Sequence, residues 1–167
     1  MKSPAPSANS VASVSKQLAA FIAKFDPKVA KLIRACRTEM RKLLPTAIEL
    51  VYDNYNFFVI GYSSTLRPSD CFTQLVADAH GVRLAFYWGA KLPDPAGILL
   101  GSGNQNRFIR LESARDLAKP EVEAMIHAAA AQGKAPLPTA GRGTLVIRSV
   151  SAKQRPRRVA AKPKRSR

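Results

Sequence analysis

A tight turn between two short apolar runs constrains the fold of this chain more than any other feature. Residues 71–77 and 82–88 are joined by Asp78-Ala79-His80-Gly81, a connection typical of a β-hairpin. Strands joined by so short a turn must run antiparallel. In the second run, large apolar residues occupy alternate positions: Val82, Leu84, Phe86 and Trp88. They share one face of the predicted strand, so a sheet with one buried side is expected.

The clearest single element is an amphipathic helix predicted over residues 28–44. Its apolar residues fall within one arc of about 120° when each residue turns by about 100°; they are Val29, Leu32, Ile33, Cys36, Met40, Leu43 and Leu44. Asp26 can cap this helix, and Pro27 suits its first position. The cations outside the arc are Lys31, Arg34, Arg37, Arg41 and Lys42, with Glu39 as the only acid. A solvated polar face is the simpler interpretation, although such a face usually mixes both signs of charge.

The remaining elements are predicted from the same periodicities. Helices are expected at 11–25 and 120–131, and residues 46–53 are expected to add one or two helical turns. The four predicted strands lie near residues 56–62, 71–77, 82–88 and 106–111. Residues 144–150 form either another strand or a segment along the body. Helices at both ends of a run of strands indicate an α+β fold: an antiparallel β-sheet packed against N- and C-terminal helices in two layers.

The distribution of charge divides the chain into three parts. Residues 1–10 form a flexible lead, 11–150 an α+β domain and 151–167 a basic tail. No acidic residue follows Glu123, whereas the tail holds eight cations, at Lys153, Arg155, Arg157, Arg158, Lys162, Lys164, Arg165 and Arg167. The net charge is +16, and with eight positive charges in the tail the rest of the chain carries +8. We predict a disordered arm.

Such an arm attracts polyanions and releases their counterions, so its binding to nucleic acid is salt-sensitive and reads no sequence. We expect the arm to carry most of any affinity for nucleic acid. The alternative is a solubilising tail without a partner. No apolar run is long enough to span a membrane, and the first residues lack the apolar segment of a signal peptide, so a cytoplasmic location is expected. Cys36 and Cys71 lack metal-ligand spacing and are expected as reduced, buried thiols.

The segment that begins at Glu49 is the best candidate for a ligand pocket. Polar and aromatic side chains alternate here, and the pocket would contain Glu49, Tyr52, Asp53, Asn54 and Tyr55. The alternative is a rigid junction with half-buried tyrosines. An adjoining Arg107 or Arg110 would favour an enzyme acting on a small anionic substrate. The loop 101–104 is Gly-rich but leads into a predicted strand, which favours a turn over a phosphate-binding loop.

These segments resemble the YdhG-like family, a bacterial domain with no assigned general function. The resemblance runs from about residue 27 to residue 133. It rests on Leu44-Pro45, on Glu49-Leu-Val-Tyr-Asp-Asn-Tyr-Asn56, on Asp94-Pro95 and on Gly101-Ser-Gly-Asn-Gln-Asn-Arg-Phe-Ile-Arg110. Residues 145–158 are similar to a recurrent ending of one branch. The resemblance implies helices covering an α+β sheet, with a fold similar to that of frataxin, and one branch is linked to iron delivery.

Three functions follow as hypotheses. The first is a non-enzymatic cytoplasmic binding protein, without a cofactor, whose basic tail contacts nucleic acid. The second is a frataxin-like iron-handling chaperone; iron binding of that type uses an acidic first helix, whereas the early helices here are basic. The third is an enzyme acting on a small anionic substrate at the junction that contains Tyr52. No residue pattern in the chain names a reaction.

Overall fold

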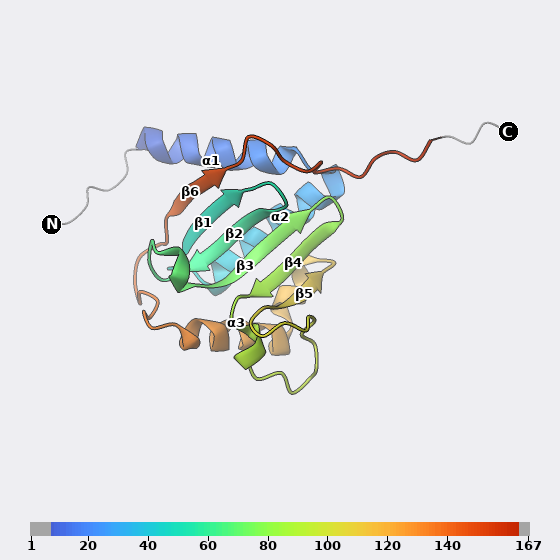
Figure 1. The fold of residues 1–167 in the computed structure, drawn as a ribbon. Coiled ribbons are helices and arrows are strands. Elements are labelled where there is room, and N and C mark those ends of the chain that lie inside the picture. Colours follow the sequence, from blue (N-terminus) through green and yellow to red (C-terminus); the bar gives the residue numbers. More distant parts are fainter. Residues whose placement is uncertain (1–7, 164–167) are drawn as a thin grey trace.

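The computed structural model describes residues 8–163 as an α+β fold with three α-helices and a six-stranded mixed sheet (Figure 1). The helices are α1 (Ala8–Ala23), α2 (Pro27–Leu43) and α3 (Pro120–Gln132). The strands are β1 (Ile48–Asp53), β2 (Phe58–Ser63), β3 (Cys71–Asp78), β4 (Gly81–Phe86), β5 (Arg107–Leu111) and β6 (Leu145–Val150). Short 3-10 turns occupy Pro68–Asp70, Gly89–Lys91 and Ala114–Ala118.

The sheet has the strand order β5-β4-β3-β2-β1-β6. Strands β1 to β5 pair antiparallel in chain order, and the predicted hairpin is confirmed, with Asp78 opposite Gly81. The sixth strand, β6, pairs parallel with β1. The sheet is therefore largely but not wholly antiparallel, because the chain passes through α3 before β6 returns to the edge strand β1.

The prediction of helical turns over residues 46–53 is wrong, because most of this segment forms β1. The two faces of β1 explain the error. Glu49, Val51 and Asp53 lie on the side of the sheet that faces the core, whereas Leu50 is buried on the other side. With carboxylates on the core side and apolar residues on both sides, the simple alternation of polar and apolar residues is lost.

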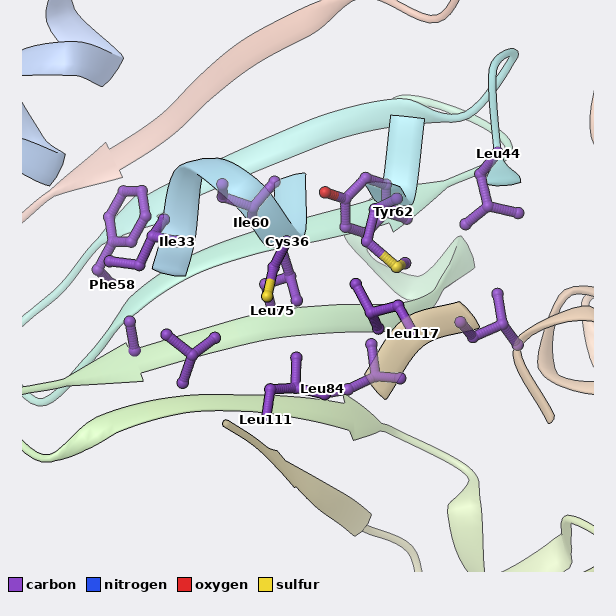
Figure 2. Close-up of a cluster of buried hydrophobic side chains, with 14 of the residues drawn as sticks. Ile33, Cys36, Leu44, Phe58, Ile60, Tyr62, Leu75, Leu84, Leu111 and Leu117 are labelled. Atoms are coloured by element: carbon purple, nitrogen blue, oxygen red, sulfur yellow. The ribbon is translucent and has the colours of Figure 1, made fainter. Parts of the chain in front are cut away.

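The core forms between the sheet and the apolar side of α2. Figure 2 shows Ile33 and Cys36 of α2 pointing toward Ile60, Leu75 and Leu84 of the sheet. These side chains are at most 2% exposed. The helix begins at Pro27 as predicted, but the side chain of Asp26 makes no capping hydrogen bond. The predicted amphipathic helix therefore packs on the sheet by the stripe of residues that its sequence specifies.

The ends of other elements differ from their predictions. Helix α1 begins at Ala8, so part of the expected flexible lead is helical, and residues 1–7 lie outside the described residues. Strand β4 ends at Phe86, and Trp88 is 40% exposed instead of sharing the buried face. In α3, four residues are buried against the core, namely Val122, Met125, Ile126 and Ala129.

The other face of the sheet is turned toward the viewer in Figure 1, where α2 passes behind the strands. Within residues 8–163, that view shows no helix crossing the front of the central strands. The strand register places Tyr52, Val59 and Val76 side by side on this face. Arg83 and Arg110 continue the same row across β4 and β5.

Candidate functional site

The predicted pocket does not form as a unit, because β1 sends its candidate residues to opposite sides of the sheet. Glu49 and Asp53 are buried on the core side, with 5% and 0% of their surface exposed. Tyr52 is half-buried on the other side, and Tyr55 is exposed in the turn between β1 and β2. Asn54 precedes that turn, and its side-chain oxygen accepts a hydrogen bond from the Ser149 hydroxyl at 2.6 Å.

Arg107 and Arg110 are far from these residues in the sheet, since β5 and β1 are separated by three strands. One Arg107 guanidinium nitrogen, Nη1, donates to the main-chain oxygens of Gly103 and Asn106 at 2.5 and 2.8 Å. Arg107 thus holds the Gly-rich loop closed. Arg110 is exposed, and its guanidinium lies 5.9 Å from the ring centre of Phe108. Neither arginine joins a pocket with Tyr52.

The carboxylate of Glu49 is bound by an arginine of α2. Arg37 holds it in a two-pronged ion pair, with nitrogen-to-oxygen distances of 2.8 and 2.9 Å. Burial alone would lower the pKa of Arg37, but the hydrogen bonds and charge of Glu49 outweigh burial and raise it. Burial, reinforced by the charge of Glu49, raises the pKa of Tyr62 well above its ordinary value. This cluster joins α2 to the sheet and leaves Glu49 unavailable to a ligand.

The carboxylate of Asp53 is bound by an arginine of the C-terminal segment. Arg157 Nη2 donates to Asp53 Oδ1 at 2.9 Å and to the main-chain oxygen of Asn54 at 2.5 Å. Lys24 Nζ lies 2.6 Å from Asp53 Oδ2. Burial would raise the pKa of Asp53, but the hydrogen bonds that it accepts, led by the one from Lys24, hold that pKa below its ordinary value.

These contacts correct the prediction that the tail is disordered from residue 151 onward. The Ser151 amide donates to the main-chain oxygen of Asp53, and the Arg155 amide to that of Tyr55, both at 2.9 Å. Arg157 is 5% exposed, so this expected polyanion-binding residue is buried. Local composition predicts disorder because the segment contains eight positive charges and no acid. The carboxylate that neutralises Arg157 is Asp53, which lies 104 positions away in the chain, so local composition does not include it.

The other tail cations have different environments. Lys153, Arg155, Arg158 and Lys162 are exposed. Lys164, Arg165 and Arg167 lie outside the described residues. Arg158 donates to the main-chain oxygens of Lys24 and Ala23 at 3.1 and 3.4 Å. These bonds place Arg158 beside the end of α1, and Val159 and Ala160 then line a hollow with the turns that contain Asn56 and Asp78.

The outer side of α2 carries an excess of positive charge. We call the α2 basic face the five exposed cations of this helix: Lys28, Lys31, Arg34, Arg41 and Lys42. Two of the five are paired with carboxylates: Lys42 lies 2.8 Å from Glu39, and Arg41 lies 3.9 Å from Glu49, which Arg37 also holds. Within residues 8–163, no ion pair is formed by Lys28, Lys31 or Arg34.

A further cation adjoins the other end of this face. The loop before β6 passes close to the end of α2, where the Gly143 amide donates to the main-chain oxygen of Pro45 at 3.0 Å. Arg142 lines a hollow of about 350 Å³ together with three cations of α2, namely Arg37, Arg41 and Lys42. The basic surface of α2 therefore extends at its C-terminal end to Arg142, which the sequence alone does not place beside the helix.

The other chemical possibilities receive little support from the described residues. Within residues 8–163, no three His, Cys, Asp or Glu side chains are placed to hold a metal ion together. Cys36 and Cys71 are free thiols whose pKa burial raises, to about 12 and about 11 respectively. In the same part of the chain, no helix combines the length and the apolar character needed to cross a bilayer.

Comparison of the sequence with models of known protein families and with curated proteins, and of the fold with solved structures, finds no match.

Proposed function

We propose that this chain is a non-enzymatic nucleic-acid-binding protein. The observation that carries the proposal is the α2 basic face, whose five cations are exposed and of which Lys28, Lys31 and Arg34 form no ion pair within residues 8–163. We further propose that the chain is a YdhG-like domain of two layers, with a frataxin-like fold, and that it acts in the cytoplasm. The basic surface then lies on the helical layer.

Binding through this surface is electrostatic. Lysine and arginine side chains neutralise phosphates and release counterions, so affinity falls as salt rises, and phosphate contacts alone read no base sequence. From Lys28 to Lys42 the helix is about 21 Å long, enough to follow several successive phosphates. The sequence alone predicts that the tail carries most of the affinity for nucleic acid. Since Arg157 is buried, we propose instead that α2 and the exposed cations of the tail share this affinity.

The two alternative functions have weaker support. An iron-handling chaperone needs free carboxylates, but Glu49 and Asp53 are bonded to arginine and lysine side chains. An enzyme at the junction with Tyr52 needs an arginine beside it, and Arg107 and Arg110 lie on the distant strand β5. Neither alternative accounts for the unpaired cations of α2.

The test compares charge reversal on and off this face. Lys31→Glu/Arg34→Glu changes the net charge by four units on α2. Arg110→Glu/Lys134→Glu makes the same change at two exposed positions outside α2, on β5 and after α3. Binding of both full-length variants to a DNA duplex and to single-stranded RNA is measured at low salt, with the native chain beside them.

We expect the α2 variant to lose most of its affinity for both nucleic acids and the control variant to retain most of it. Circular dichroism shows whether both variants remain folded. Equal losses in the two variants would mean that only net charge matters and would overturn the assignment of the surface. Absence of binding by the native chain at low salt would overturn the proposed function.

A further inference from the structure

A second surface lies on the side of the sheet opposite α2. There a hollow of about 500 Å³ opens beside the start of β3, a volume in the range of small-molecule pockets. The strand register places Tyr52 and Gln74 on this side, since their neighbours Val51 and Leu75 face the core. The 3-10 turn Pro68–Asp70 forms one wall, and the residues that follow β4 form another.

The walls of this hollow are mainly aromatic. Tyr52, Phe72, Tyr87 and Trp88 all line it. The rings of Tyr87 and Trp88 meet edge to face, with their centres 5.0 Å apart. These two side chains are 47% and 40% exposed although they are large and apolar. They present ring surfaces against which a planar ligand can stack.

The polar groups around the hollow indicate which hydrogen-bonding groups and which charge such a ligand would have. Gln74 lines the hollow, and within residues 8–163 its side-chain amide forms no hydrogen bond. An amide offers both a donor and an acceptor, which matches the edge of a nucleobase. Lys91 is not part of the lining, but its ammonium lies 5.3 Å from the ring centre of Trp88, which is. A positive charge there favours an anionic group on the ligand and disfavours a cationic one.

We propose that this hollow binds a mononucleotide, with its base stacked on the aromatic side chains and its phosphate near Lys91. The base meets the Gln74 amide, and the net charge of +16 further favours an anionic ligand. A quaternary ammonium ligand would also suit aromatic walls, but Lys91 and the charge of the chain oppose it. The site is separate from the α2 basic face and goes beyond the proposed function.

The chain contains a single tryptophan, so Trp88 reports directly on this site. AMP is titrated into the full-length protein while the fluorescence of Trp88 is recorded, and calorimetry repeats the titration. Adenosine, inorganic phosphate and choline are titrated in parallel. We expect saturable binding of AMP, weaker binding of adenosine, and none of phosphate or choline. No saturable response to AMP in either measurement, or choline binding tighter than AMP binding, would overturn the proposal.

Two substitutions locate the site. Because stacking on an aromatic side chain contributes substantially to base binding, Tyr87→Ala is expected to raise the Kd for AMP by about tenfold. Gln74→Leu is expected to raise it by about fivefold, because the base edge loses its partner. Tyr55→Ala, at an exposed tyrosine outside the hollow, and Lys31→Glu/Arg34→Glu are expected to leave it unchanged. Native affinity in Tyr87→Ala would overturn the site, whereas a loss in the α2 variant would assign AMP to the basic face.

Discussion

The guanidinium of Arg157 donates to the carboxylate of Asp53 at 2.9 Å, and the two residues are separated by 104 positions in the chain. Both side chains are buried, with 3% and 0% of their surface exposed. Two other Arg157 nitrogens, Nε and Nη1, are buried without a hydrogen-bond partner within residues 8–163, and the guanidinium lies 5.8 Å from the ring centre of Phe25. One ion pair thus closes the C-terminal segment onto α1 and β1.

Arg157→Ala is expected to lower the free energy of unfolding by about 3 kcal/mol, because removing one partner leaves the other charge buried. Lys24 still reaches Asp53, which limits the loss. Urea denaturation measures the change. Arg155→Ala is the matched control: it removes an exposed tail arginine whose side chain only approaches the ring of Tyr55, and should cost less than about 0.5 kcal/mol. Equal stability of the two variants would show that the buried pair contributes nothing.

The buried carboxylate of Asp53, bonded to Lys24 and to Arg157, makes stability depend on pH. The pKa of Asp53 is lower in the folded protein than the value of about 3.9 for a free aspartate, so the unfolded chain binds the proton first. This contribution is present above about pH 4 and is lost as the pH falls through the folded pKa. Asp53→Asn should therefore show a shallower loss of stability between roughly pH 5 and pH 2. Identical acid unfolding profiles would contradict this role.

Gly143 allows the loop before β6 to pass close to Ala47. An added Cβ at this position would overlap the main-chain oxygen of Ala47, at only 1.7 Å. Gly143→Ala is therefore expected to destabilise the protein by about 2 kcal/mol or more, because the backbone must shift. Gly103→Ala is the control, since a Cβ there meets no atom within 4 Å. Thermal unfolding compares the two, and an unchanged Tm in Gly143→Ala would show that the loop moves freely.

Local patterns in the sequence predict most of the framework. The spacing of the apolar residues in α2 predicts a helix, and the turn at residues 78–81 predicts a hairpin. Each pattern is local in the sequence, and both elements are confirmed. Strand β1 is missed because Glu49 and Asp53 occupy core positions where a strand usually has apolar residues. Their partners, Arg37 and Arg157, come from other elements, so no local pattern shows that these carboxylates are neutralised.

The candidate sites depend on long-range contacts in the same way. The positive side of α2 is visible in the sequence, but Arg142 joins it only through folding. The aromatic hollow combines Tyr52 of β1 with Trp88, which follows β4. The alternation of β4 predicts a buried Trp88, and its exposure results from the end of the strand at Phe86. Sequence spacing therefore predicts the elements better than it predicts the surfaces that they share.

The central claim is that α2 and the tail together bind nucleic acid. A chain ending at Arg158 tests it most directly, because it retains the Asp53–Arg157 pair and removes the four cations beyond it. The dependence of DNA affinity on salt is measured for this form and for the full chain, since each phosphate contact adds about 0.9 to the slope of log K against log salt concentration. The account predicts a reduced but clear slope in the shortened form, and a further reduction by Lys31→Glu/Arg34→Glu. Complete loss of binding in the shortened form would contradict it, since the tail alone would then carry the affinity.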